Sequence, residues 1–171
     1  MVNNDPATLQ EAPGSLERVR ELLNTWLIPN DTRLETDRYD AYTSAHQLGP
    51  RQARQLRRLR DDLRAVLEHA EDADQRLDRW SADLEVRVGV RDGRLRFLHA
   101  AGPTGEMFGH VLAAIADDTW QRLKACPDCR WVFYDHTRNR SKRWCLMNAG
   151  GPHGRACGTI AKVTRYRMTH A

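Results

Sequence analysis

Four stretches of the first 124 residues carry apolar side chains at every third or fourth position, which is the period of an amphipathic α-helix. These stretches span residues 16–26, 52–68, 73–83 and 105–124. The second stretch is rich in arginine, and we expect its arginines on the outer face. Pro29 stops the first helix, and the chain after it is polar for about ten residues. The pattern therefore predicts a largely helical N-terminal part.

Between the third and fourth predicted helices the apolar period changes to two, which indicates strands. The alternating apolar residues are Leu84, Val86, Val88, Val90, Leu95 and Phe97. Asp92-Gly93 separates the two halves of this run, and this pair favours the two-residue turn of a β-hairpin. The predicted fold class is α+β, with a helical N-terminal domain that includes a small antiparallel hairpin or sheet.

Charge divides the chain at about residue 120. The net charge is +4, but residues 121–171 hold eleven Lys and Arg against two acidic residues, a net charge of +9, whereas residues 1–120 carry −5. A basic segment of this size is typical of a protein that binds a polyanion. Alternatively, the cations only keep a small module in solution. We predict a flexible leader over 1–14, one domain over 15–124 and a second over 125–171.

All four cysteines lie in the basic segment, at Cys126, Cys129, Cys145 and Cys157, with the spacing C-x2-C-x15-C-x11-C. A C-x2-C turn lets two thiolates face one tetrahedral ion, and a closed set of four thiolates indicates structural rather than catalytic zinc. A segment of this length also lacks the apolar surface to fold firmly alone, so metal binding would supply much of its stability. Residues 125–171 are therefore predicted to form a small zinc finger.

The order of residues around the cysteines predicts a treble-clef-like arrangement. Residues 131–134 would form one strand and 142–145 the returning strand of a hairpin, with Cys145 at its end. Cys157 would open a final helix over 159–168, where the helix N-terminal amides favour a thiolate.

Three alternatives to a four-cysteine zinc site are compatible with the sequence. The four thiols could be unrelated buried side chains. The C-x2-C pair could be a redox centre, although the flanking strand and long helix of that chemistry are missing. His153, in the loop between Cys145 and Cys157, could replace one cysteine as a zinc ligand.

Cationic residues surround the predicted metal site and give a candidate nucleic-acid-binding set. Its members are Arg138, Arg140, Lys142, Arg143, Lys162, Arg165 and Arg167. Arg and Lys bind phosphates and by themselves read no base sequence. Trp131 and Trp144 lie among them, and we expect these rings to fill the small core of the finger. DNA is the predicted partner.

The C-terminal part resembles the CGNR zinc finger of a bacterial family. The resemblance rests on Cys126-Pro-Asp-Cys-Arg-Trp-Val-Phe-Tyr-Asp, Thr137-Arg-Asn-Arg-Ser-Lys-Arg-Trp-Cys and Ala161-Lys-Val-Thr-Arg-Tyr-Arg. The N-terminal part resembles, more loosely, the ABATE domain that usually accompanies this finger, through Leu23-Asn24-Thr25, the arginine-rich helix and the hairpin. The resemblance implies a stress-induced transcription regulator in which the finger contacts DNA.

Two features depart from the family pattern. Cys157-Gly158 is followed by Thr159-Ile160, where the family has Asn and Arg. The stretch between Cys145 and Cys157 is also longer than is usual in the family. If the Asn and Arg normally hold the finger or contact phosphate, this chain has lost that contact.

Three functions compete. The first is a DNA-binding regulator whose N-terminal domain senses a small-molecule effector or a partner, and a homodimer would suit it. The second is a small-molecule-binding protein or enzyme in which the finger is only a scaffold. The third is an adaptor that docks an acidic protein. The sequence contains no Gly-rich phosphate loop, nucleophile elbow or HExxH motif, which favours a non-enzyme.

The polar groups available to a small-molecule site in the N-terminal part are His46, His69, His99, Glu106 and His110. His99 and His110 flank the turn after the hairpin and are the candidate ligand site. The chain is 40% hydrophobic and 29% charged, as in a globular protein. No apolar run approaches the roughly 18 residues that a membrane helix needs, and no secretory signal opens the chain. We expect a cytoplasmic protein without a membrane partner.

Overall fold

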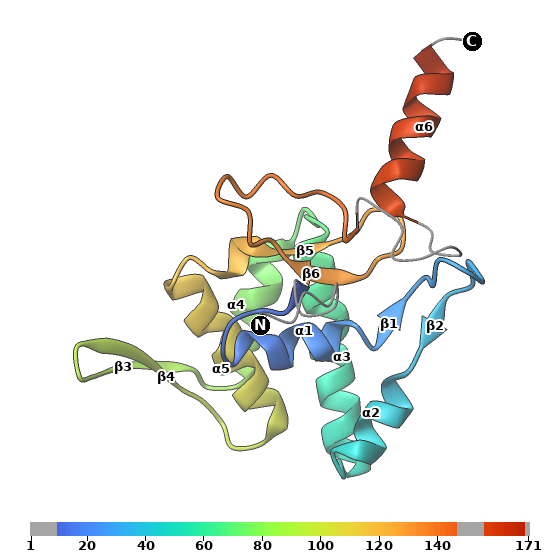
Figure 1. The fold of residues 1–171 in the computed structure, drawn as a ribbon. Coiled ribbons are helices and arrows are strands. Elements are labelled where there is room, and N and C mark those ends of the chain that lie inside the picture. Colours follow the sequence, from blue (N-terminus) through green and yellow to red (C-terminus); the bar gives the residue numbers. More distant parts are fainter. Residues whose placement is uncertain (1–9, 147–155, 170–171) are drawn as a thin grey trace, which may run out of the picture.

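The computed structural model describes residues 10–146 and 156–169 (Figure 1). Most of the predicted leader and the loop that carries His153 therefore lie outside the described residues. The elements in chain order are α1 Leu16–Leu23, β1 Trp26–Leu27, β2 Thr36–Asp37, α2 Tyr39–Ala45, α3 Pro50–Leu67, α4 Ala73–Asp83, β3 Arg87–Arg91, β4 Arg94–Leu98, α5 Pro103–Ala116, a 3₁₀ turn Trp120–Arg122, β5 Leu123–Ala125, β6 Val132–Tyr134 and α6 Cys157–Thr169.

Helices α1, α3 and α5 pack against one another around a single apolar core, with α4 packed against α3. The fully buried side chains at its centre include Leu22, Leu59, Leu63, Phe108 and Val111. These residues fall on the apolar faces that the sequence pattern marks, which confirms the α+β fold class with a helical N-terminal part. Each such side chain contributes about 1.5–3 kcal/mol through burial.

Helix α1 is shorter than predicted, and Trp26 lies on strand β1 instead of on the helix. The helix stops at Leu23 because the side chain of Asn24 pairs with the backbone of Val132, a residue 108 positions away. Thr25 donates its hydroxyl to the carbonyl of Leu22 at 2.8 Å and closes the helix end. A contact of this range leaves no periodic signal in the sequence.

The predicted helix over 105–124 is also too long at its C-terminal end. Helix α5 ends at Ala116, Asp118 adopts a left-handed conformation with φ of 57°, and residues 123–125 form strand β5. The apolar residue Leu123 fits a helical period by chance, but β5 pairs with β6 in an antiparallel ladder. The predicted helices over 52–68 and 73–83 are confirmed as α3 and α4.

Two arginines of α3 are buried, contrary to the prediction that its arginines lie outside. Arg60 is 3% exposed and pairs with Asp37 of β2 at 2.8 Å, while the adjacent Arg57 binds the same carboxylate at 2.7 Å. Arg64 is 7% exposed, and burial lowers its pKa to about 10. Arg64 donates to the carbonyls of Leu23 at 2.8 Å and of Arg130 at 3.0 Å, so it ties α1 to the C-terminal part.

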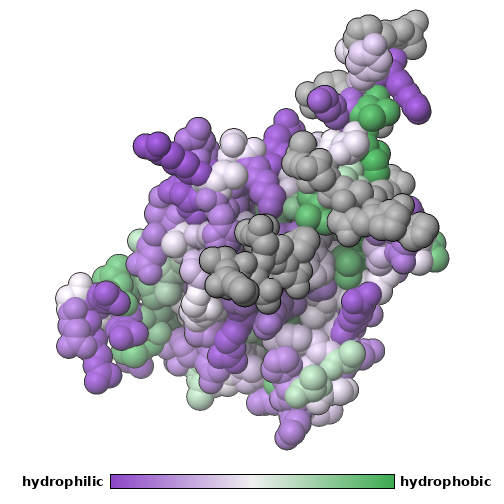
Figure 2. Space-filling model, viewed as in Figure 1, coloured by the Kyte–Doolittle hydropathy of each residue, from purple (hydrophilic) through white to green (hydrophobic). Residues whose placement is uncertain are grey.

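The predicted hairpin is present as β3 and β4, with Val88 opposite Phe97 and Val90 opposite Leu95. Asp92 and Gly93 both have positive φ, as the predicted tight turn requires. The hairpin projects from the helical body (Figure 1), and Val90 is 73% exposed. Figure 2 shows this apolar surface beside hydrophilic residues at one end of the molecule. The strand begins only at Arg87, because Leu84 caps α4 and is buried in the core with Val86 packed against that core. From Arg87 onward the alternation marks strands without marking a core.

The C-terminal hairpin differs from the predicted one. Strand β6 pairs with the preceding β5, and residues 142–145 do not form a returning strand. The backbone of Lys142 instead donates to the carboxylate of Asp135 at 2.8 Å, so it cannot join a ladder. The final helix is confirmed as α6, and Cys157 is its first residue.

The C-terminal segment shares the core of the helical body. Leu123, Val132 and Tyr134 belong to the same buried cluster as the residues of α1, α3 and α5. A second cluster contains the four cysteines and Phe133, with Trp131 and Trp144 packed against it. The two tryptophans thus support the finger core, as predicted. Within the described residues, no helix is both long and apolar enough to cross a bilayer.

Candidate metal centre

Four cysteine sulfurs converge at the junction of β5, β6 and α6. The Sγ atoms of Cys126, Cys129, Cys145 and Cys157 all lie within 4.8 Å of one another, and all four residues are buried. The Cys129 and Cys145 sulfurs are 3.4 Å apart, and those of Cys145 and Cys157 are 3.7 Å apart. These are the cysteines that the spacing identifies as a ligand set.

Backbone hydrogen bonds hold the first two cysteines in a tight turn between β5 and β6. The amide of Cys126 donates to the carbonyl of Trp131 at 2.9 Å, and the amide of Arg130 donates to the carbonyl of Cys126 at 2.9 Å. Arg130 closes the turn with a φ of 60°. The turn therefore presents the thiols of Cys126 and Cys129 to the same point.

The other two cysteines come from later parts of the chain. Cys145 lies in an irregular segment, and Cys157 begins α6. The amide of Gly158 donates to the carbonyl of Leu146 at 3.0 Å, which joins the two segments beside the sulfurs. Thr159 and Ile160, where the family has Asn and Arg, occupy the first turn of α6, with Thr159 exposed and Ile160 half-buried.

The helical body contributes contacts to the cysteine cluster that the sequence does not reveal. The side-chain amide nitrogen of Asn30 lies 3.4 Å from Cys157 Sγ, and the amide of Ile28 donates to the carbonyl of Cys129 at 2.9 Å. Arg33 pairs with Asp128 inside the C-x2-C turn at 3.0 Å. These residues follow α1 in a segment that carries no cysteine spacing or apolar period, so no sequence signal points to them.

The close packing of four thiols makes their ionisation interdependent. Contacts with Cys129 and then Cys145 lower the pKa of Cys126, whereas contacts with Cys126 and Cys129 raise the pKa of Cys145. Four thiolates at this separation repel one another strongly unless a cation lies between them. The cluster therefore fits a metal-bound state better than a set of free thiolates.

The donor set fits zinc. Thiolates that surround a tetrahedral Zn²⁺ at about 2.3 Å lie roughly 3.8 Å apart. The Cys129–Cys145 and Cys145–Cys157 sulfurs are 3.4 and 3.7 Å apart, and all four sulfurs lie within 4.8 Å of one another. Four sulfur ligands leave no position for water or substrate, so such an ion would stabilise the fold and take no part in a reaction. The four cysteines are positioned to bind one metal ion.

A buried carboxylate supports the segment between the second and third cysteines. Asp135 is fully buried and accepts hydrogen bonds from Lys124 Nζ at 2.7 Å and from the Thr137 hydroxyl at 2.6 Å. Burial by itself raises the pKa of Asp135, but the bonds from Lys124, Thr137 and Lys142 prevail and lower it to about 2. Asp135 therefore stays charged and fixes the loop that leads to Cys145.

The predicted nucleic-acid-binding residues occupy different environments. Arg138, Arg143, Lys162 and Arg167 are exposed. Arg140 pairs with Asp118 and also donates to Gln121 at 3.1 Å, and the Lys142 ammonium lies 5.0 Å from the centre of the Phe133 ring. The side chain of Arg165 lies outside the described residues. The exposed members are on the loop after Asp135 and on α6.

The two histidines of the candidate ligand site line one cavity of about 380 Å³ between β4 and α5. His99 rests against Gly105, where a Cβ atom would stand 2.7 Å from His99 Nδ1 and displace the ring. Burial, and then the charge of Arg18, lowers the pKa of His110. His110 Nε2 is buried without a hydrogen-bond partner within the described part of the chain. Ligand binding there stays a prediction.

A C-x2-C turn, an irregular segment and a helix start that bring four thiols together define a zinc-finger-type metal site. Residues 122–170 match the family model of the CGNR zinc finger. The matched segment contains all four cysteines and confirms the resemblance of the C-terminal part to this finger, despite Thr159-Ile160. Among curated proteins, none matches this chain.

Proposed function

We propose that this protein is a zinc-dependent DNA-binding regulator of transcription whose finger contacts the phosphate backbone. The observation that carries the proposal is the set of exposed cations next to the cysteine cluster. Arg138 and Arg143 lie on the loop that precedes Cys145, and Lys162 and Arg167 lie on the helix that Cys157 begins. Zinc would fix both segments relative to each other, since each supplies a ligand.

The position of α6 supports DNA as the polyanion. Helix α6 stands away from the rest of the molecule (Figure 1), and its described side chains beyond Ala161 are exposed. A basic helix of this kind can enter a groove of DNA while cations at its base bind phosphates. Binding through phosphates releases counterions, so the affinity should fall as salt rises.

The test is a titration of the zinc-loaded protein with short random-sequence duplex DNA at several salt concentrations. Fluorescence anisotropy measures the binding. Arg138→Ala combined with Arg143→Ala should weaken binding and reduce the slope of log K against log salt by about two. The matched control combines Arg51→Ala with Arg54→Ala, because these arginines are exposed on α3. Equal effects of the two pairs, or no DNA binding by wild type, would contradict the proposal.

The cavity with His99 and His110 favours a second candidate, a small-molecule-binding protein or enzyme with the finger as scaffold. Its buried His110 Nε2 has no hydrogen-bond partner among the residues that the structure describes, and it could accept or donate one hydrogen bond to a ligand. Under this candidate, His110→Phe would abolish binding of that ligand and leave zinc content unchanged. A ligand screen by thermal shift, run on wild type and on this variant, separates the two functions.

A further inference from the structure

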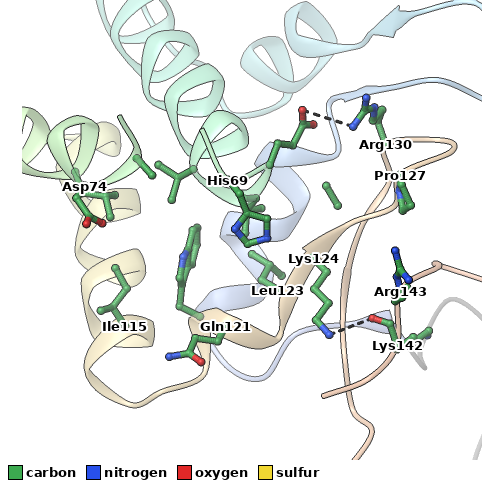
Figure 3. Close-up of a pocket in the computed structure, with 17 residues that line it drawn as sticks. His69, Asp74, Ile115, Gln121, Leu123, Lys124, Pro127, Arg130, Lys142 and Arg143 are labelled. Carbon is green, nitrogen blue, oxygen red and sulfur yellow. Dashed lines mark hydrogen bonds and ion pairs between the residues drawn. The ribbon is translucent and has the colours of Figure 1, made fainter. Parts of the chain in front are cut away.

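A second cavity, of about 850 Å³, lies between the helical body and the zinc finger (Figure 3). The helical body supplies apolar wall residues: Leu67, Leu77, Ile115 and Trp120. The finger supplies cations: Lys124, Arg130, Lys142 and Arg143. In Figure 3 the labelled Ile115 and Asp74 lie on one side of the space, Leu123 lies near its centre, and Arg130 and Arg143 lie on the other side. The cavity therefore combines an apolar wall with several cations, and its lining also includes the carboxylates of Glu68 and Asp74.

Two of these cations are engaged in the fold. Lys124 Nζ donates to the Asp135 carboxylate at 2.7 Å and to the carbonyls of Arg140 at 2.5 Å and Lys142 at 3.1 Å, which uses its three donors. The Lys142 ammonium lies over the ring of Phe133. The Lys124 ammonium therefore has no donor left for a ligand.

The two arginines are better placed to receive an anion. Arg143 is exposed at the cavity. Arg130 pairs with Glu68 at 3.6 Å, and both side chains are more than a third exposed, so this contact contributes little. A guanidinium group can bind a carboxylate through two parallel N–H donors, so either arginine can receive a planar anion.

We propose that this cavity is a binding site for an amphipathic small-molecule anion. Arg143 and Arg130 bind its carboxylate, and an aromatic or aliphatic body packs against Trp120 and the apolar residues of α4 and α5. A volume of about 850 Å³ lies within the range of roughly 300–1,000 Å³ that small-molecule sites occupy. The site is distinct from the cavity that contains His99 and His110.

Occupation of the cavity would also regulate the finger, a step that rests on the proposed DNA-binding function. Arg143 belongs both to this cavity and to the exposed cations that are proposed to contact phosphate. A carboxylate bound to Arg143 neutralises that cation, so the bound anion lowers the affinity for DNA. The coupling follows from competition for one side chain and requires no change of fold.

The experiment uses 1-naphthoate as the probe and the neutral 1-naphthamide as its isostere, with binding to the zinc-loaded full chain measured by isothermal titration calorimetry. Two variants address the cations and the apolar wall of the cavity: Arg143→Ala removes a cation, and Ile115→Glu adds a carboxylate at a partly exposed position of the apolar wall. Their controls are Arg138→Ala and Leu34→Glu, which make the same changes at exposed positions outside the cavity.

We expect saturable binding of 1-naphthoate that is at least tenfold weaker in Arg143→Ala and in Ile115→Glu, and unchanged in both controls (tenfold corresponds to about 1.4 kcal/mol). Binding of 1-naphthamide should be weaker by a similar factor. Absence of saturable naphthoate binding, or equal binding by the cavity variants and their controls, would overturn the site. Equal affinities for the acid and the amide would overturn its anion specificity.

A second measurement separates the site from the DNA proposal. Saturating 1-naphthoate should weaken DNA binding by wild type severalfold and leave DNA binding by Ile115→Glu unchanged. If the probe binds as expected but wild type does not bind DNA, the cavity is supported and the DNA-binding function is refuted. If both bind independently, the regulatory step is refuted.

Discussion

Asp135 stays ionised in a fully buried position because each of its oxygens receives hydrogen bonds from the loop around it. The donors are the Lys124 ammonium, the Thr137 amide and hydroxyl, and the Lys142 amide. A buried charge is tolerated only when it is paired and hydrogen-bonded in this way. The same contacts determine the course of the chain toward Cys145, so this carboxylate links loop geometry to the metal site.

Asp135→Asn should lower the free energy of unfolding by about 2–4 kcal/mol, because the half-buried Lys124 ammonium loses its counter-charge and the new NH₂ group faces two donors. These donors are either the Thr137 amide and hydroxyl or the Lys142 amide and the Lys124 ammonium. The folded-state pKa of about 2 lies below the ordinary 3.8, so the stabilisation is present above about pH 4 and is lost as the pH falls toward 2. Urea unfolding followed by circular dichroism checks this. Asp78→Asn, an exposed change on α4, should have little effect, and an equal loss in both variants would contradict the role of Asp135.

Single substitutions can also test which residue is the fourth zinc ligand. Cys157→Ser should release zinc to a competing chelator at least tenfold more readily, because serine does not provide a thiolate ligand. His153→Ala should leave the zinc affinity unchanged, since the four sulfurs already converge. Zinc content by mass spectrometry and chelator competition test both variants. Loss of zinc from His153→Ala with retention in Cys157→Ser would show that histidine completes the site.

At the scale of elements, the junction of α1 with β6 joins the helical body to the C-x2-C turn. Asn24 donates its side-chain amide to the carbonyl of Val132 at 2.9 Å and accepts from the amide of the same residue at 2.7 Å. These two hydrogen bonds take the place of those from a neighbouring strand, and they involve both the N–H and the C=O of Val132, the first residue of β6. Strand β6 therefore pairs with β5 on one side and with a side chain on the other.

Asn24→Ala should destabilise the protein by about 1–3 kcal/mol, because it leaves the buried N–H of Val132 without its partner and the Val132 carbonyl with only the longer bond from Arg20, at 3.3 Å. The same change should accelerate zinc release, since Val132 follows Cys129 closely in the chain. Thermal unfolding and the rate of chelator-induced zinc loss are the two measurements. Asn139→Ala, an exposed change on the following loop, is the control. An unchanged rate of zinc release in Asn24→Ala would show that the pairing of β6 with Asn24 does not stabilise the metal site.

On the scale of the whole molecule, the helical body and the C-terminal segment share one core. Leu123, Val132 and Tyr134 lie in the cluster formed by α1, α3 and α5. Removal of zinc should therefore disturb the helical body as well as the finger. After zinc is removed by a chelator, we expect faster hydrogen exchange in α1 and α3 as well as in residues 123–146. Mass spectrometry measures this exchange.

Unchanged protection of α1 and α3 in the chelated protein would instead show that the finger unfolds alone. The predicted division at residue 124 would then describe two independent folding units. Re-addition of zinc serves as the control for irreversible damage during chelation.

The sequence by itself determined which four cysteines are positioned to bind a metal ion, the approximate positions of α3, α4 and α6, and the hairpin around Asp92-Gly93. These features depend on local chemistry: the ligand spacing of a tetrahedral ion, the apolar period of a helix face and the backbone demands of a tight turn. Each of these features can be recognised in one segment of the sequence, because the residues that produce it all lie in that segment.

Only the tertiary structure decided that Arg60 and Arg64 are buried, that Asn24 ends α1 and that β6 pairs with β5. The partners of Arg60, Arg64 and Asn24 lie far along the chain, and a long-range hydrogen bond outweighs a local helical preference. Strand β5 is close to β6 in the sequence, but Leu123 also fits the apolar period of the preceding helix, and only the ladder with β6 identifies it as part of a strand. The cavity with Trp120 and Arg143 has the same origin. Its apolar wall and its cations belong to segments with separate and ordinary sequence patterns, and only packing of the finger on the helical body brings them together.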